Sequence, residues 1–286
     1  MQRNYKRIRD ILLYVLVLNI LVVIGKMTVG IISNSLSMIA DSLHSLFDAS
    51  SNIIGLIGLW IAQKKPDAGH PYGHSKYNSL ATIFIAFLLL LTSIQVFQGA
   101  VDKFLNPTVP ELTIYNWIIM VATIGVNIGV SRFEKQQGLK LKSSILVADA
   151  AHTSTDIYLS LSVIVSFILV SLGYPVFDPV ISVLIAVVIF YVGFSIINGI
   201  SKVLTDSLVI EPKYIEKVVY GVKGVRNVHK IRSHGTISEC FIDLHITVDD
   251  KLNVKDAHDV SVEVEANLKR EFPNIKEVMV HVEPHK

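Results

Sequence analysis

The sequence is poor in charge and in cysteine, and both shortages narrow the class of protein. Asp, Glu, Lys and Arg make up 17% of the 286 residues, whereas a soluble domain carries about 25%. The single cysteine, Cys240, excludes an internal disulfide framework and a thiolate metal cluster within one chain. A formal net charge of +2 gives no reason to expect a nucleic acid as a partner.

Two motifs of energy coupling and catalysis are also missing. The sequence contains no G-x4-G-K-[S/T] phosphate-binding loop, so we do not expect ATP to drive the protein. The H-E-x-x-H motif is absent as well, which argues against a metal-dependent hydrolase. We therefore expect that the protein is not an enzyme.

The charge deficit is concentrated in the first part of the chain. Of the 26 Lys and Arg, 14 lie in residues 1–207 and 12 in the last 79 residues. Of the 24 Asp and Glu, 11 lie in the first part and 13 in the last. We therefore expect a membrane domain over residues 1–207, followed by a soluble domain over residues 208–286.

A helix of about 20 apolar residues crosses the hydrocarbon core of a bilayer. Six segments have this character: 11–32, 37–62, 79–100, 112–130, 145–172 and 176–200. The first is too long for the apolar region of a signal peptide and lacks a small-residue cleavage site, so we expect a retained span. The fold class predicted for this part is a polytopic membrane protein with six transmembrane helices.

Positive charge in the loops predicts how the six spans are oriented. Lys and Arg collect in the N-terminal arm, in the loop between spans 2 and 3, and in the loop between spans 4 and 5. Among the Lys and Arg residues, the other three loops contain only Lys103. Both termini are therefore expected in the cytoplasm. The short loops and the lack of an organelle signal favour a prokaryotic cell membrane, with membrane lipid around the spans.

Spans 2 and 5 repeat one motif, A-D-x-x-H-x-x-x-D, at an offset of 108 residues. A helix turns by about 100° per residue, so the three polar positions of each copy fall on one face. Ionisable groups inside a membrane are costly and mark functional sites. The six residues are Asp41, His44 and Asp48 in span 2 and Asp149, His152 and Asp156 in span 5.

Two such faces turned toward each other would bring two imidazoles and two carboxylates to one point in the membrane. This set can form a tetrahedral shell that suits Zn²⁺. We interpret the His and the Asp four residues later as the ligands in each span. Asp41 and Asp149 could be further ligands, partners that orient the imidazoles, or caps. The competing interpretation is that all these groups only hold helices together by hydrogen bonds.

Span 1 carries a single cation, Lys26, which would repel a metal ion placed beside it. We expect its side chain to face a water-filled cavity or to pair with a carboxylate such as Asp41. Asn19 and Asn127 are expected to form hydrogen bonds between helices.

The loop between spans 2 and 3 contains Asp67, His70 and His74, with the spacing D-x2-H-x3-H. Two glycines and a proline among them favour tight turns, which can bring three ligands together on a short loop. A peripheral metal site at the cytoplasmic mouth is therefore predicted. The alternative is a solvated polar loop in which the histidines are incidental.

The tail has the pattern of a small α+β domain with the order αββαβ, of the ferredoxin-like type. Its expected elements are a helix over 212–220, strands over 225–232 and 240–248, a helix over 254–272 and a strand over 277–283. The alternation in 240–248 favours a half-buried edge strand. Since a core of this size is marginal, we expect the domain to pair with a second copy.

Histidines are frequent in this tail. Asp243 and His245 share one strand face, and His281 and Glu283 share another. Together with His258 at the start of the second helix they could converge into a metal site, or they could be exposed surface residues. We expect the remaining three on the surface: His229, His234 and His285.

The six spans, the paired H-x3-D, the loop and the α+β tail together resemble the cation diffusion facilitator family. The resemblance extends over about residues 10–283. Its most specific stretches are S-x-S-M-x-A-D-S-L-H-S-x-x-D and H-P-Y-G-H-x-K. It implies a homodimer that exchanges a divalent cation for protons, with a tail that senses cytoplasmic metal and tightens the dimer.

The resemblance also implies the roles of individual residues. The implied transport site is His44, Asp48, His152 and Asp156; the loop site is Asp67, His70 and His74; the cytoplasmic-domain site is His245, His258, His281 and Glu283. Lys76 and Asp206 match a charge interlock near the dimer interface. Zinc members of the family often have a His where Arg226 stands, and a cation there weakens any two-metal site in the tail.

Zn²⁺ is the ion that we predict to be transported and to regulate the protein, because two nitrogens and two oxygens favour it over Mn²⁺. Fe²⁺, Mn²⁺, Cd²⁺ and Co²⁺ can occupy similar sites. Two alternative functions therefore stay open: an exporter of Mn²⁺ or Fe²⁺, and a metal sensor or receptor without transport. A saturable flux driven by a pH gradient would be a property of the transporter alone.

Overall fold

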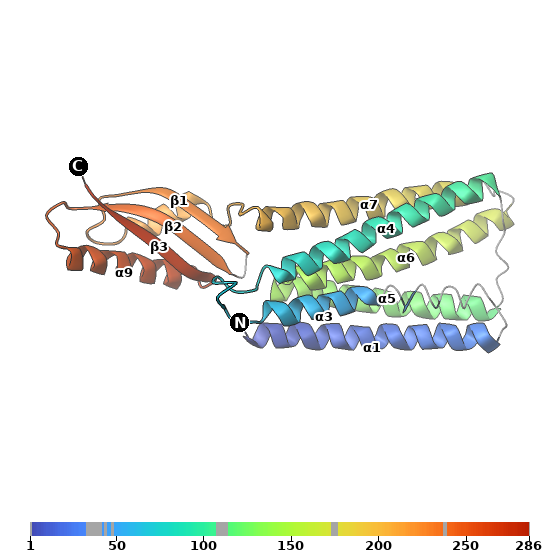
Figure 1. Ribbon diagram of the computed structural model, residues 1–286. Helices are drawn as coiled ribbons and strands as arrows, with labels where there is room; N and C mark the ends of the chain where they lie inside the picture. Colours follow the sequence, from blue (N-terminus) through green and yellow to red (C-terminus); the bar gives the residue numbers. More distant parts are fainter. Residues whose placement is uncertain are drawn as a thin grey trace. The chain divides into compact units, whose positions relative to one another are not determined.

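The computed structural model of the protein describes residues 2–32, 42, 45–46, 49–106, 114–172, 177–236 and 239–285. These residues form two compact units, Met1–Ile200 and Ser201–Lys286 (Figure 1). The first unit is helical and the second is a small α+β domain.

The helices of the first unit follow the six expected spans in order. They are α1 (Gln2–Ile32), α3 (Ser50–Ala62), α4 (Tyr77–Leu105), α5 (Ile114–Leu141), α6 (Ser144–Ser171) and α7 (Phe177–Leu204). Within the described residues, three helices are long and apolar enough to cross a membrane: Asn4–Val29, Tyr77–Asp102 and Pro179–Leu204. The predicted class, a polytopic helical membrane domain, is therefore confirmed.

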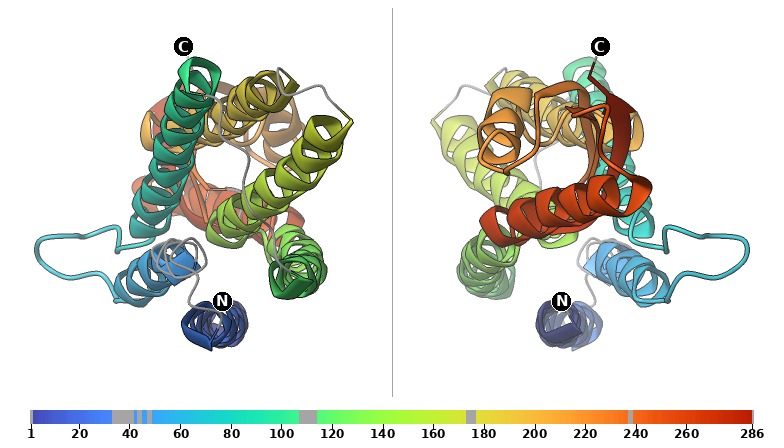
Figure 2. Two further views of the ribbon diagram at one scale, coloured as in Figure 1. Left: turned by 90° about the vertical axis from the view of Figure 1, so that its right-hand side faces the viewer. Right: turned by 90° about the vertical axis from the view of Figure 1, so that its left-hand side faces the viewer.

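α6 lies at the centre of the helix contacts, since it packs against α3, α4 and α5. The end-on view in Figure 2 (left) places α1 beside α3 and α5, in agreement with its contacts. Side chains that are fully or almost fully buried fill the space between these helices, among them Leu12, Leu59, Ile85 and Leu146. This packing fixes the face that α6 turns toward α1 and α5.

The second unit has the predicted αββαβ order. Its elements are α8 (Pro212–Val219), β1 (Asn227–Gly235), β2 (Cys240–Val248), α9 (Val254–Glu271) and β3 (Ile275–Pro284). The strand order is β1-β2-β3, with β1 antiparallel and β3 parallel to β2. The expectation that 240–248 is an edge strand is wrong, because β2 is central. Alternation reports that one face is buried, and it carries no information about neighbours in the sheet.

The apolar face of the sheet packs against the two helices of the unit. Ile242, Leu244 and Ile246 of β2 are buried with Ile215 of α8 and Leu268 of α9. Because side chains alternate along a strand, the residues between them in β2 lie on the other face. That face therefore carries Asp243 and His245.

Candidate metal centres

His152 and Asp156 lie one turn apart on α6 and line a cavity of about 80 Å³ together with residues of α1 and α5. His152 is 4% exposed. All but Val22 and Leu159 of the twelve lining residues are polar or charged. A polar cavity among apolar helices is the environment in which a membrane protein holds ions. The partner motif residues Asp41, His44 and Asp48 lie outside the described residues.

Asp149 is fully buried and is not among the residues that line this cavity. Ser51 donates a hydrogen bond of 2.6 Å to its Oδ1, and Asn52 donates one to its Oδ2. Asn52 in turn accepts a hydrogen bond of 2.8 Å from Asn19 of α1. Asp149 therefore joins α6 to α3 and, through Asn52, to α1. These contacts link helices, and the choice between a further ligand, a partner that orients the imidazoles and a cap stays a prediction.

A residue that sequence reasoning missed, Glu134 of α5, completes this group. It is fully buried, and its carboxyl interacts electrostatically with the buried carboxyl of Asp149 on α6. Its oxygens accept no hydrogen bond from the described residues. Two carboxylate charges close together and away from water repel each other, so their burial side by side is costly. No motif marks Glu134, since its partner comes from another helix.

The loop before α4 brings its three predicted ligands together. Ligand atoms of Asp67, His70 and His74 all lie within 4.8 Å of one another. The backbone N–H groups of Gly69 and His70 donate to Asp67 Oδ1 at 3.0 and 2.8 Å. The hydrogen bond from the His70 backbone is the main reason that the pKa of Asp67 lies below its ordinary value, which keeps the carboxylate anionic.

His74 is the buried member of this loop group, with 6% of its surface exposed. Its Nε2 lies 3.5 Å from Asp67 Oδ2, and its Nδ1 has no hydrogen-bond partner in the described part of the chain. Nε2 is therefore the nitrogen that can share a cation with the Asp67 carboxylate. The two imidazoles and the carboxylate thus fit a divalent cation such as Zn²⁺.

The predicted interlock residues fall in different units. Lys76 precedes α4 in the first unit, and Asp206 follows α7 in the second. Within the second unit, Asp206 Oδ1 lies 3.5 Å from His234 Nδ1. The interlock between Lys76 and Asp206 stays a prediction.

A one-residue irregularity in β1 builds the site of the second unit. Gly235 pairs with Cys240 and Arg232 with Asp243, but His229 pairs with His245 after a register shift. Lys230, inside the shift, has a φ of 50°, a left-handed conformation typical of bulges. Without the extra residue Lys230 would stand opposite His245. The bulge therefore places His229 on the face of the sheet that carries His245.

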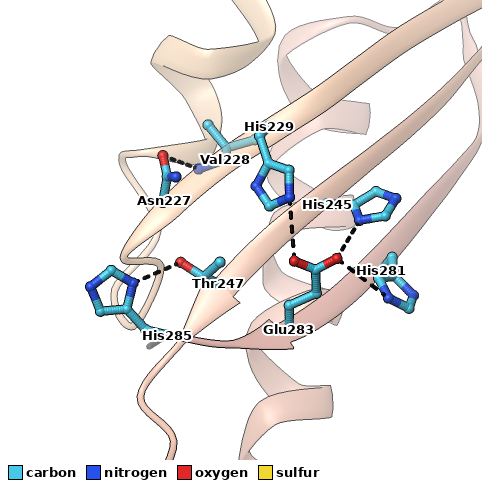
Figure 3. Close-up of polar contacts among 8 residues, drawn as sticks. All are labelled: Asn227, Val228, His229, His245, Thr247, His281, Glu283 and His285. Carbon is cyan, nitrogen blue, oxygen red and sulfur yellow. Dashed lines mark hydrogen bonds and ion pairs between the residues drawn. The ribbon is translucent and has the colours of Figure 1, made fainter.

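Glu283 of β3 bridges these histidines (Figure 3). Its Oε1 lies 2.8 Å from His245 Nδ1, and its Oε2 lies 3.3 Å from His229 Nε2. His281 Nε2 lies 3.7 Å from Oε1. The hydrogen bond with His245 is the main cause that holds the pKa of Glu283 below its ordinary value. A divalent cation can bind between an anionic carboxylate and neighbouring imidazoles of this kind.

The membership of this group differs from the one expected. Ligand atoms of His229, His245 and Glu283 lie within 4.8 Å of one another. His229 was expected on the surface, but it is half-buried and paired with Glu283. His258 is exposed on α9 and is not a member of the group. Arg226, at the position where zinc members of the family often have a His, lies 3.5 Å from Asp249 Oδ2.

Two family models match almost the whole chain. The cation efflux transmembrane domain matches residues 12–204, and the cytoplasmic domain of cation efflux proteins matches residues 210–285. The chain therefore belongs to the cation efflux family, whose members are divalent cation transporters of membranes. The resemblance inferred from the paired H-x3-D and the D-x2-H-x3-H loop is confirmed.

Curated relatives align over most of this chain. An uncharacterized transporter of Methanocaldococcus jannaschii is 33% identical over 93% of this chain and 94% of its own length. The manganese efflux system protein MneP of Bacillus subtilis is 27% identical over 97% and 96%. Among solved structures, the MamM-CTD H285A structure is 26% identical over 26% of this chain and 92% of its own, with a TM-score of 0.25.

Proposed function

We propose that the protein exports Zn²⁺ from the cytoplasm in exchange for protons, through a site formed by His44, Asp48, His152 and Asp156. The observation that carries this proposal is the polar cavity between membrane helices into which α6 brings His152 and Asp156. The repeated motif supplies the second His and Asp from the segment before α3.

The donor set supports Zn²⁺ as the cargo. Two imidazole nitrogens and two carboxylate oxygens suit a tetrahedral zinc ion, whereas Mn²⁺ prefers more oxygen ligands. Mn²⁺ is the second candidate, because two relatives, MneP and MneS of Bacillus subtilis, are manganese efflux system proteins. Additional oxygen ligands from cavity residues such as Thr123, Asn127 and Ser160 would favour Mn²⁺.

Exchange for protons follows from the chemistry of the ligands. An imidazole binds a metal ion only in its neutral form and titrates near pH ~6.5, so binding of the cation expels protons. In the inward-open state His44 and His152 are neutral and accept the cation from the cytoplasm. The helices then rock, and the cation leaves on the outside. Protons bind the His and Asp side chains there, the site returns to face the cytoplasm, and the protons leave before the next cation binds.

The second unit acts as a cytoplasmic metal sensor in this proposal. A cation held by His229, His245 and Glu283 tightens a homodimer and favours the transport-competent state, since a ligand that binds one state better shifts the equilibrium toward it. The loop site of Asp67, His70 and His74 binds a cation at the cytoplasmic mouth. Both termini lie in the cytoplasm, and the protein sits in the cell membrane.

Flux into vesicles with an imposed pH gradient tests the proposal. We expect saturable Zn²⁺ uptake that stops when a protonophore collapses the gradient. Uptake of Mn²⁺ and not of Zn²⁺ would support the proposed site and show that the predicted ion is wrong. Metal binding without any flux would show a sensor or receptor and contradict transport.

A further inference from the structure

Lys26 shares the cavity of the transport site. Its side chain lines the same space of about 80 Å³ as His152 and Asp156, although it comes from α1 and they come from α6. Lys26 Nζ donates a hydrogen bond of 2.8 Å to Ser45 Oγ, which also lines the cavity. The side chain is half-buried. The structure thus places a cationic group in the cavity that would hold the transported cation.

A charged side chain at this place costs free energy, so we expect the charge to serve a function. A lysine in the membrane interior is unfavourable unless it faces a polar cavity or a partner charge. A group that only joined α1 to Ser45 would not need a charge, because neutral side chains form the same kind of hydrogen bond. The nearby pair Asn19 and Asn52 joins α1 to α3 in this neutral way.

The positive charge has a direct consequence for a divalent cation in the same cavity. Like charges repel, and the repulsion is strong where water is scarce. A site of two imidazoles and two carboxylates without this charge would bind Zn²⁺ tightly and release it slowly. A transport site must bind its ion weakly enough to let it go. When the cation has left, an ammonium in the cavity also balances the negative charge of Asp156.

We propose that Lys26 is a tethered cation that sets the affinity of the transport site and speeds release of the metal. This inference rests on the proposed function, because it assumes that the cavity of His152 and Asp156 carries the cation. Lys26 is not a metal ligand in this account. It acts on the ion through its charge, and its contact with Ser45 holds that charge at the cavity.

Lys26→Met tests the proposal, because methionine has a similar length and no charge. In Zn²⁺ flux assays with the full-length protein in vesicles, we expect KM to fall by about tenfold or more, together with a lower kcat. Lys26→Arg keeps the charge and should leave KM close to that of the wild type. Lys140→Met makes the same change on the exposed end of α5, outside the cavity, and serves as the matched control.

A merely structural role gives a different pattern. Loss of packing would lower kcat, leave KM unchanged or raised in Lys26→Met, and lower the thermal stability of the detergent-solubilised protein. That result, or a KM for Lys26→Arg that falls as far as that of Lys26→Met, would overturn the inference. If the wild-type protein carried no Zn²⁺ or Mn²⁺ at all, the proposed function itself would fail, so the two failures are distinct.

Discussion

His229 and His245 face each other across the β1–β2 ladder, with ring centroids 5.3 Å apart, and both contact the carboxylate of Glu283. The bulge at Lys230 creates this relationship, because it shifts the register by one residue. A shift of one residue moves a side chain to the other face of a sheet. The proposed cation site of the second unit therefore depends on a backbone irregularity.

Replacement of His229 should weaken the cytoplasmic site as much as replacement of His245. We expect His229→Ala to lower the Zn²⁺ affinity at least ~10-fold. Loss of a residue that only hydrogen-bonds to a metal ligand already lowers metal affinity by about that factor, and loss of a ligand should cost no less. Isothermal titration of the full-length protein with Zn²⁺ measures this affinity. The protein also carries Asp67→Ala and Asp156→Ala, which remove a ligand from the loop site and from the transport site. His258→Ala is the matched control, because His258 is exposed on α9. An equal loss in the control would contradict the assignment.

Ionised Glu283 should stabilise the metal-free protein at neutral pH. Its pKa is lowered in the fold, mainly by the hydrogen bond with His245. A lowered pKa adds stability above the ordinary value of about 4.3, and that stability disappears as the pH falls toward the folded value. Glu283→Gln should therefore lower the Tm at pH 7 and have little effect at pH ~3. Thermal unfolding in detergent measures both, and a constant difference at all pH values would refute the linkage.

The burial of Glu134 near Asp149 predicts different effects for two substitutions of Glu134. Glu134→Gln keeps the size and polarity of the side chain and removes any charge repulsion with Asp149, so it should preserve both folding and transport. Glu134→Ala removes a fully buried side chain and leaves a cavity, so the free energy of unfolding should fall by about 2–4 kcal/mol. Thermal unfolding gives the comparison, with Lys135→Ala on the exposed side of α5 as control. Equal damage by Gln and Ala would show that the carboxyl group itself is required, and would contradict this prediction.

Gly58 of α3 lies against Ala81 of α4, and substitutions at these two positions test the contact. A Cβ placed on Gly58 would lie 2.3 Å from the Cβ of Ala81, closer than real atoms approach. Gly58→Ala should cost about 1–3 kcal/mol, and adding Ala81→Gly should restore part of it. Gly129→Ala on α5, where the described residues leave open space, should not destabilise. An additive double variant would show that the two positions do not touch.

Local patterns predicted the elements of the fold well. The apolar runs of 79–100 and 176–200 became α4 and α7, and the periodicity of 254–272 became α9, because each pattern lies within one element. The one-turn spacing of His152 and Asp156 likewise follows from helix geometry alone. Lys26 was expected to face a cavity or a carboxylate, and the structure places it at a cavity.

Contacts between elements could not be predicted in this way. The central place of β2, the pairing of His229 with His245 and the burial of Glu134 beside Asp149 all depend on register or on helix packing. A bulge of one residue has no strong signature in the sequence around Lys230. These long-range features nevertheless decide which histidines meet and which carboxyl groups are buried together.

The most direct test of the central claim is Zn²⁺ flux through the Asp156→Ala protein in vesicles with a pH gradient. Asp102→Ala serves as the control, because it removes an exposed carboxylate at the end of α4, away from the cavity. The account predicts that Asp156→Ala folds, still binds Zn²⁺ at the cytoplasmic site and carries none across the membrane, whereas Asp102→Ala transports at the wild-type rate. Wild-type flux in Asp156→Ala would contradict the account.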